Sequence, residues 1–125
     1  MQTVTGACHF CGQIRQVEFE EDTQVTDDMA DDRAMMGCDC GDARREQRRR
    51  KKIEKGRTDI DELFGKQENT YEVAEILNTA LIHIVDGKLS KITVERGKIK
   101  AKISQTSKAG IKVERTVTQK DVLES

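Results

Sequence analysis

The four cysteines of the chain lie in two close pairs, Cys8 with Cys11 and Cys38 with Cys40. The first pair has the spacing C-x2-C, the second has C-x-C, and 26 residues separate the two pairs. Zinc in structural sites takes four tetrahedral ligands, with thiolate sulfurs about 2.3 Å from the ion and supplied in pairs by tight turns. We therefore predict one structural zinc ion, Zn²⁺, held by Cys8, Cys11, Cys38 and Cys40.

Glycines beside both pairs indicate the turns that such a site needs. Gly12 follows the first pair, and Gly37 and Gly41 flank the second. Because glycine adopts positive φ angles without steric cost, we expect these residues to let backbone amides fold over the sulfurs. His9 lies between the first two cysteines and could replace one sulfur as a ligand, but we interpret it as a bystander. The C-x-C spacing departs from the C-x2-C of a zinc ribbon.

Other uses of the cysteines fit the sequence less well. Two disulfides would require an oxidising compartment, yet the opening residues, MQTVTGACHF, lack the basic start and apolar run of a secretory signal. A disulfide within the C-x-C pair would be strained, and no thioredoxin-like pattern surrounds the C-x-x-C. Free thiols or an iron–sulfur cluster remain as alternatives to zinc. We expect a reducing compartment and predict that the protein is cytoplasmic.

Charge is strongly segregated along the chain, although the net charge is only −1. Residues 18–32 contain eight acidic side chains and no basic one, whereas residues 44–57 contain nine basic and two acidic side chains. Residues 88–120 contain ten basic and two acidic side chains. Four thiolates on one zinc ion carry a charge of −2 together, which the basic run after Cys40 would balance. Solvated faces explain part of this pattern, but the degree of segregation favours a surface that binds a partner.

The first half of the chain is predicted to form one strand and two helices around the cysteines. Residues 13–20 contain regularly placed apolar side chains and predict a short strand. Thr26 can cap a short helix, in which the aspartates that follow suit the positive end of the helix dipole. We expect Asp42 to cap a second, longer helix that ends at Gly65. Cys40 would then lie just before a helix N-terminus, where thiolate is favoured over thiol.

The longer helix is basic and has little apolar surface in its first part. No large apolar side chain occurs between Ala43 and Ile53, so we expect this stretch to lie outside a core and to depend on residues of high helix propensity. Gly56 disfavours an unbroken helix, by about 1 kcal/mol relative to alanine. A narrow apolar stripe follows at Ile53, Ile60, Leu63 and Phe64.

The second half is predicted to begin with the main core helix. A linker at residues 65–69 precedes this helix, and Asn69 or Thr70 would cap it. Apolar residues recur at helical spacing, which indicates the buried face of the helix. These residues are Val73, Ile76, Leu77, Ala80, Leu81 and Ile84.

Alternation of polar and apolar residues then predicts three strands, in residues 91–95, 98–103 and 111–114. We expect Arg96-Gly97 to form a two-residue hairpin turn and the segment QTSKAG to form a longer one. The result is an antiparallel meander whose apolar face packs on the preceding helix. Its other face carries lysines, which either deter edge-to-edge aggregation or bind a partner.

The sequence therefore predicts an α+β protein, and its 125 residues suit one domain or a small metal-binding module attached to one modest core. Residues 1–65 would form a four-cysteine zinc-knuckle module with a long basic helix. Residues 66–125 would form an αβββ unit, a helix packed on a three-stranded antiparallel meander.

Neither catalysis nor membrane insertion is supported by the sequence. It contains no P-loop, no G-x-G-x-x-G and no serine–histidine–acid pattern, and a zinc ion with four thiolates has no open position for water. The acidic run at residues 18–32 lacks the ligand spacing of a calcium loop. No segment approaches the roughly 18 apolar residues of a membrane span. We predict neither an enzyme nor a membrane protein.

Several segments resemble small uncharacterised proteins of phages and prophages that contain a zinc knuckle similar to a zinc ribbon. These segments are CHFCGQ, CDCGDARREQRRRKKI, LFG and KITVERGKIKAKISQTSKAGIKVERTVTQ. The resemblance covers most of the chain. It implies a small accessory or regulatory protein of a mobile element, and it implies no particular activity.

Two classes of function are consistent with these features. In the first, which we favour, the zinc unit supports a basic helix that binds nucleic acid through its phosphates, in the manner of a zinc finger. The residues predicted to do so are Arg44, Arg45, Arg48, Arg49, Arg50, Lys51 and Lys52. In the second, the protein binds a host or phage protein. Acidic residues 18–32 would then imitate phosphates, and binding would inhibit or modulate a defence or nucleic-acid-processing protein.

Overall fold

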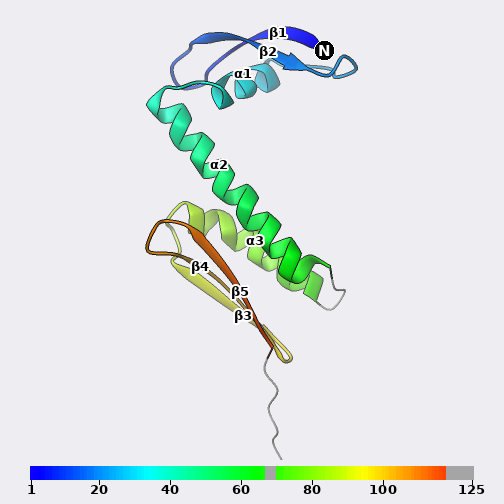
Figure 1. Ribbon diagram of the computed structural model, residues 1–125, viewed down its shortest axis with the longest axis vertical. Coiled ribbons are helices and arrows are strands. Elements are labelled where there is room, and N and C mark those ends of the chain that lie inside the picture. The colour runs from blue at the N-terminus through cyan, green and yellow to red at the C-terminus, as the bar shows by residue number, and fades with distance from the viewer. Residues whose placement is uncertain (67–69, 118–125) are drawn as a thin grey trace, which may run out of the picture. The chain divides into compact units, whose positions relative to one another are not determined.

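The computed structural model describes residues 1–66 and 70–117 and has the predicted α+β character (Figure 1). The chain forms two compact units, Met1–Arg50 and Lys51–Ser125. The sequence predicted a division after residue 65 instead, at a linker whose residues 67–69 lie outside the described part. The second unit begins earlier than that because Ile53 and Ile60 contribute to its core.

The first unit contains a two-stranded sheet and a short helix. Strand β1 (Gln2–Ala7) pairs antiparallel with β2 (Ile14–Phe19), the strand that the sequence predicted, so that Val4 lies opposite Val17. Strand β1 was not predicted, since its residues were interpreted as part of the knuckle. Helix α1 (Asp27–Met36) packs on both strands. A Cβ atom added to Gly6 would collide with the backbone oxygen of Ala30, so the glycine permits the close approach of β1 and α1.

Helix α1 has the predicted cap. The hydroxyl of Thr26 accepts a hydrogen bond from the Met29 amide at 3.2 Å, and the Gly37 amide donates to the Ala34 carbonyl at the other end. The small core of this unit consists of Val17, Phe19, Ala30 and Ala34. In addition, the Arg33 guanidinium lies 3.9 Å from the centre of the Phe19 ring, a favourable cation–π distance.

Helix α2 (Gly41–Ile60) is unbroken and leads directly into a π-helical turn, η1 (Asp61–Gly65). It continues through Gly56 because that position packs against α3. A Cβ atom at Gly56 would lie 2.5 Å from Cδ1 of Leu81. Glycine therefore allows the two helices to approach closely, an effect that helix propensity alone does not reveal.

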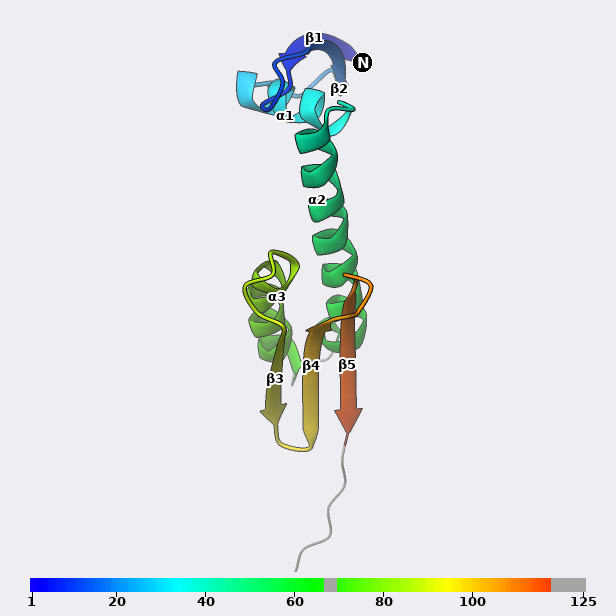
Figure 2. The same ribbon diagram turned by 90° about the vertical axis from the view of Figure 1, so that its left-hand side faces the viewer.

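The second unit is the predicted αβββ arrangement. Helix α3 (Tyr71–Val85) packs on a sheet of β3 (Lys91–Arg96), β4 (Ile99–Gln105) and β5 (Ile111–Val117). The strand order is β3-β4-β5 and every neighbouring pair is antiparallel (Figure 2). Apolar residues of one sheet face, such as Ala101 and Ile103, join the core formed by α3 and the end of α2.

Helix α3 buries most of the predicted apolar residues but not Ile76, which is 47% exposed. The buried positions are Val73, Ala74, Leu77, Ala80, Leu81 and Ile84. On an α-helix these residues occupy one continuous arc, and Ile76 projects just outside it. The prediction that Ile76 belongs to the core is therefore wrong.

Two local predictions in the second unit need correction. Arg96 pairs with Ile99, so the two-residue hairpin turn is Gly97-Lys98, one residue later than predicted, with φ of 58° at Gly97. Of the two candidate caps of α3, Asn69 lies outside the described residues. Thr70 makes no cap hydrogen bond, and its buried hydroxyl donates instead to the Phe64 carbonyl at 2.6 Å.

Among the described residues, no helix combines the length and the apolar composition that crossing a lipid bilayer would require.

Candidate metal centre

The structure brings together the sulfurs of Cys8, Cys11, Cys38 and Cys40, all within 4.8 Å of one another. The sulfurs of Cys11 and Cys38 are 3.4 Å apart, and those of Cys8 and Cys40 are 3.9 Å apart. A tetrahedral zinc ion with Zn–S bonds of about 2.3 Å holds its sulfurs about 3.8 Å from one another. The observed spacing therefore fits a single metal ion of this coordination.

Two short loops present these sulfurs. In the first, which joins β1 to β2, the Cys8 amide donates to the Gln13 carbonyl and the Gly12 amide to the Cys8 carbonyl. Gly12 has φ of 76°, as predicted for this turn. The second loop joins α1 to α2, and there Gly37 has φ of −101°, so it does not adopt the predicted positive angle. Gly41 begins α2 and is not at positive φ either.

Cys40, and not Asp42, supplies the side-chain acceptor at the start of α2. The Cys40 sulfur accepts a hydrogen bond from the Ala43 amide at 3.4 Å, and its carbonyl accepts one from the Arg44 amide at 3.0 Å. Asp42 lies inside the first turn and pairs with Arg45. A thiolate at Cys40 would thus bind the metal and also satisfy a free amide at the positive end of the helix dipole.

The centre has a buried side and a solvent side. Cys8 and Cys38 are each only 3% exposed and pack with Met35 and Ala43, whereas Cys11 is exposed. A metal ion here would be enclosed by apolar side chains on one side and reached by solvent near Cys11.

The thiols cannot all ionise without a compensating cation. The Cys11 amide lowers the pKa of Cys8 to about 7. The Gln13 amide acts on Cys11 in the same direction, but contact with Cys38, burial and the other two sulfurs outweigh it and raise the Cys11 pKa to about 12. The pKa of Cys40 is also raised, because burial and neighbouring thiols outweigh the Ala43 amide. A divalent cation among the sulfurs would remove this conflict, and its binding would release protons.

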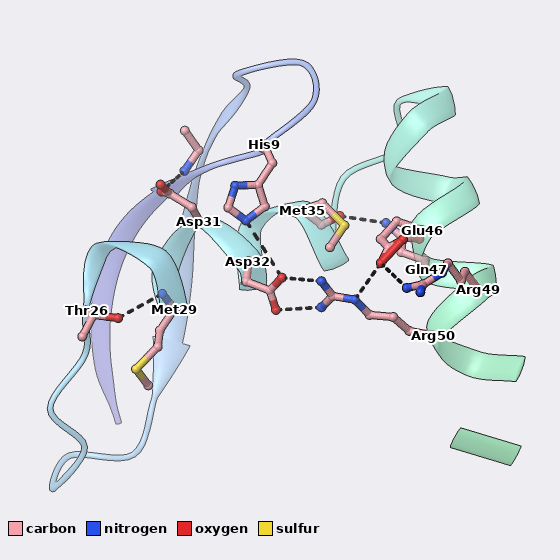
Figure 3. A network of polar contacts seen from close by, with 11 residues as sticks. His9, Thr26, Met29, Asp31, Asp32, Met35, Glu46, Gln47, Arg49 and Arg50 are labelled. Atoms are coloured by element: carbon pink, nitrogen blue, oxygen red, sulfur yellow. Dashed lines mark hydrogen bonds and ion pairs between the residues drawn. The ribbon is translucent and has the colours of Figure 1, made fainter. Parts of the chain in front are cut away.

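His9 points toward Asp32 of α1 (Figure 3). Its Nε2 lies 3.9 Å from Oδ1 of Asp32, and it is not part of the group of potential ligands.

A network of polar side chains attaches the first turns of α2 to α1 (Figure 3). It also attaches them to the loop between α1 and α2 that carries Cys38 and Cys40, which we call the metal loop. Two nitrogens of Arg50 each lie 2.8 Å from a different carboxylate oxygen of Asp32, and Nε of Arg50 lies 3.2 Å from Glu46. This contact with Arg50 lowers the pKa of Asp32. The side-chain amide of Gln47 donates to the carbonyls of Met35, at 2.9 Å, and Cys38, at 2.7 Å.

The seven predicted nucleic-acid-binding residues therefore divide into two groups. Arg45, Arg49 and Arg50 form ion pairs with Asp42, Glu46 and Asp32 inside the first unit. The other four, Arg44, Arg48, Lys51 and Lys52, have no acidic partner among the residues that the structure describes, and all but the half-buried Lys52 are exposed. The pairs Asp42–Arg45 and Glu46–Arg49 have the i,i+3 spacing of neighbours on one helix, whereas the pairing of Arg50 with Asp32, 18 residues away, is not visible in the sequence pattern.

Comparison with known proteins identifies no relative, since no family model, curated protein or solved structure matches this chain.

Proposed function

We propose that the first unit is a zinc-stabilised module that binds nucleic acid through the exposed arginines of α2. The observation that carries this proposal is the position of Arg44 and Arg48. Both are exposed, neither has an acidic partner among the described residues, and they lie one turn apart on a helix that begins at the thiol cluster. Arginine binds phosphate with two parallel hydrogen bonds, which suits it to the backbone of nucleic acid.

The donor set supports zinc as the metal. Four thiolates in tetrahedral arrangement are typical of structural zinc. Sulfurs within 4.8 Å of one another suit one ion, whereas an iron–sulfur cluster places several irons and sulfides between its cysteines. With no position left for water, the ion would stabilise the loops and take no part in catalysis. Reduced cysteines of this kind suit a cytoplasmic protein.

Other polar side chains of α2 position the helix in this proposal. Arg50 and Gln47 bind α1 and the metal loop, so they hold the helix in position while Arg44 and Arg48 stay available. Ordering these two side chains on a preformed helix costs less conformational entropy than ordering a disordered basic segment. A regulatory role in a mobile element, which the sequence resemblance implies, is compatible with such a module.

The proposal is tested by the salt dependence of binding to a labelled DNA duplex. Replacing Arg44 and Arg48 by Gln removes two phosphate contacts, and each contact contributes about 0.9 to the slope of log affinity against log salt. We expect the slope to flatten by about two units, with zinc content unchanged. The control variant K98Q/K100Q removes the same charge from the second unit and should leave the slope unchanged. Equal slopes for the parent and R44Q/R48Q would contradict the assignment of these arginines.

A second candidate function, binding of a protein, is favoured by a hollow beside α1. It has a volume of about 300 Å³ and is lined by Phe19, Met29, Asp32, Arg33 and Met36. Met29 and Met36 are 38% and 41% exposed, and methionine adapts well to varied apolar partners. The acidic side chains of residues 18–32 would favour a basic protein. Absence of nucleic-acid binding by the parent at low salt would make this candidate the better one.

A further inference from the structure

Lysines from separate parts of the second unit lie at one end of its sheet. Lys91 on β3, Ser104 on β4 and Lys112 on β5 form one row across the strands. The row therefore has a lysine on each outer strand and a neutral hydroxyl residue between them. It lies next to the end at which β3 and β5 begin and β4 ends.

Two loops add further lysines at the same end (Figure 2). Lys88 lies in the connection from α3 to β3, and Lys108 lies in the connection from β4 to β5. The Gln105 amide donates to the Ser90 carbonyl at 3.0 Å, which ties the first connection to the end of β4.

Helix α2 contributes lysines beside the second of these loops. Lys52 and Lys55 line a small hollow of about 80 Å³ together with Gly110 and Ile111, the residues that end the loop and begin β5. Asp59 also lines this hollow and supplies one opposing charge. We call Lys52, Lys55, Lys88, Lys91, Lys108 and Lys112 the lysine end.

The two strand lysines of the lysine end, Lys91 and Lys112, lie directly opposite the neutral Ser104, unlike lysines elsewhere on the exposed face of the sheet. Elsewhere on the exposed face, Lys100 lies directly opposite Glu95, and Lys102 directly opposite Glu114. Opposite charges at directly facing positions of neighbouring strands attract each other.

At the lysine end, the Lys112 ammonium lies 3.4 Å from Glu114. Lys88, Lys91 and Lys108 are exposed and have no acidic partner among the described residues. Lysines that prevent edge-to-edge aggregation of the sheet would be needed only along its edge strands. This alternative therefore does not explain the lysines on the two loops and on α2.

We propose that the lysine end is a second surface that binds the phosphate backbone of duplex nucleic acid. Lysine ammonium groups on flexible stems contact phosphates as point charges and do not read sequence. A duplex is favoured over single strands, because stacking of unpaired bases needs exposed aromatic side chains. Of the aromatic residues in the described part of the second unit, Phe64 is fully buried, and Tyr71 lies at the first position of α3, whereas Lys88 follows the end of that helix.

This inference rests on the proposed function and extends it from one surface to two. Arg44 and Arg48 belong to the first unit, whereas the lysine end belongs to the second. Two weak phosphate-binding surfaces on one chain raise the overall affinity, because binding at one increases the effective concentration at the other. Removing either surface should therefore weaken binding, and removing both should weaken it further.

The test uses the full chain and a labelled DNA duplex of random sequence. The variant K91Q/K108Q removes two unpaired lysines, and K98Q/K100Q removes the same charge from the opposite, hairpin end of the sheet. We expect the slope of log affinity against log salt to flatten by about two units in K91Q/K108Q and to stay unchanged in the control. An unchanged slope in K91Q/K108Q overturns the inference, and equal flattening in both variants overturns it too, since overall charge would then explain the effect.

A second measurement separates this inference from the proposed function. The extent of acetylation of each lysine is measured in the R44Q/R48Q variant at low salt, with and without the duplex. Because this variant lacks the two arginines of the first unit, the lysines of the second unit report on their own contact with the duplex. We expect the duplex to protect Lys88, Lys91 and Lys108 more than Lys98 and Lys100. If the duplex protects these three lysines but R44Q/R48Q has the same salt slope as the parent, the lysine end is supported and the assignment of Arg44 and Arg48 is refuted. Equal modification with and without the duplex would overturn the lysine end, whatever the arginines do.

Discussion

At the scale of single residues, Gly56 shows how packing can reverse a propensity argument. An exposed glycine inside a helix is usually improved by alanine, by up to about 1 kcal/mol. Here the added methyl group would lie 2.5 Å from Leu81, which is fully buried and has little room to move.

We predict that Gly56→Ala destabilises the second unit by about 1–2 kcal/mol, as overpacking does in other cores. Urea denaturation of the full chain, followed by a probe in the second unit, measures this. Gly41→Ala is the matched control in the same helix, because a methyl group there would meet nothing within 4 Å. Increased stability of the Gly56 variant would show that α2 and α3 are not packed as described.

Gln47 is a second residue whose structural role could not be predicted from the sequence. Within a basic segment it looks like a solvent-facing helix former, yet its amide bridges the carbonyls of Met35 and Cys38. It thereby positions the loop that carries two of the four thiols.

We predict that Gln47→Ala weakens zinc affinity by about tenfold, within the range known for residues that support metal ligands from outside the coordination shell. Competition with a chromophoric chelator measures this affinity. Arg45→Ala, on the same helix but with Asp42 as the partner of its side chain, should leave this affinity unchanged. The same affinity for the Gln47 variant and the parent would refute the supporting role.

At the scale of elements, the regular patterns predicted the structure well. The cap at Thr26, the strand Ile14–Phe19 and the three-strand meander follow from local signals, and all are present. The clustering of the four thiols also follows, because paired spacings and Gly12 restrict the local turns.

The errors arise where a tertiary contact decides the outcome. Strand β1 has the weak pattern QTVTGA and is stabilised by its pairing with β2 and by α1, which approaches Gly6 closely. Cys40 replaced Asp42 as the acceptor at the start of α2 because the metal loop brings its sulfur to the Ala43 amide. The hairpin turn lies one residue later than predicted, at Gly97-Lys98, because Arg96 pairs with Ile99 and so belongs to β3.

At the scale of the whole molecule, the two units differ in what holds them together. The second unit has a continuous apolar core in which Phe64, Leu77, Leu81, Ile84 and Ile103 are fully buried. The first unit has two small clusters, and one of them is built around the cysteines themselves. Small units with so little apolar surface usually need a metal or disulfides to fold.

We predict that removal of the metal unfolds most of residues 1–50 and leaves the second unit folded. Metal binding would supply much of the folding free energy of the first unit, since the thiols have no comparable interaction when the site is empty. Amide NMR spectra of the full chain, recorded with and without a strong chelator, measure the effect. Collapse of the signals of both units would show instead that they fold as one.

The metal centre is central to the first unit, because its four thiols come from the loop between β1 and β2 and from the loop that precedes α2. Elemental analysis of protein purified under reducing conditions tests it most directly. We predict one zinc ion per chain, and loss of that zinc when Cys8 and Cys38 are replaced by serine. Substoichiometric metal in every preparation of the parent, or full zinc content in the serine variant, would contradict the claim.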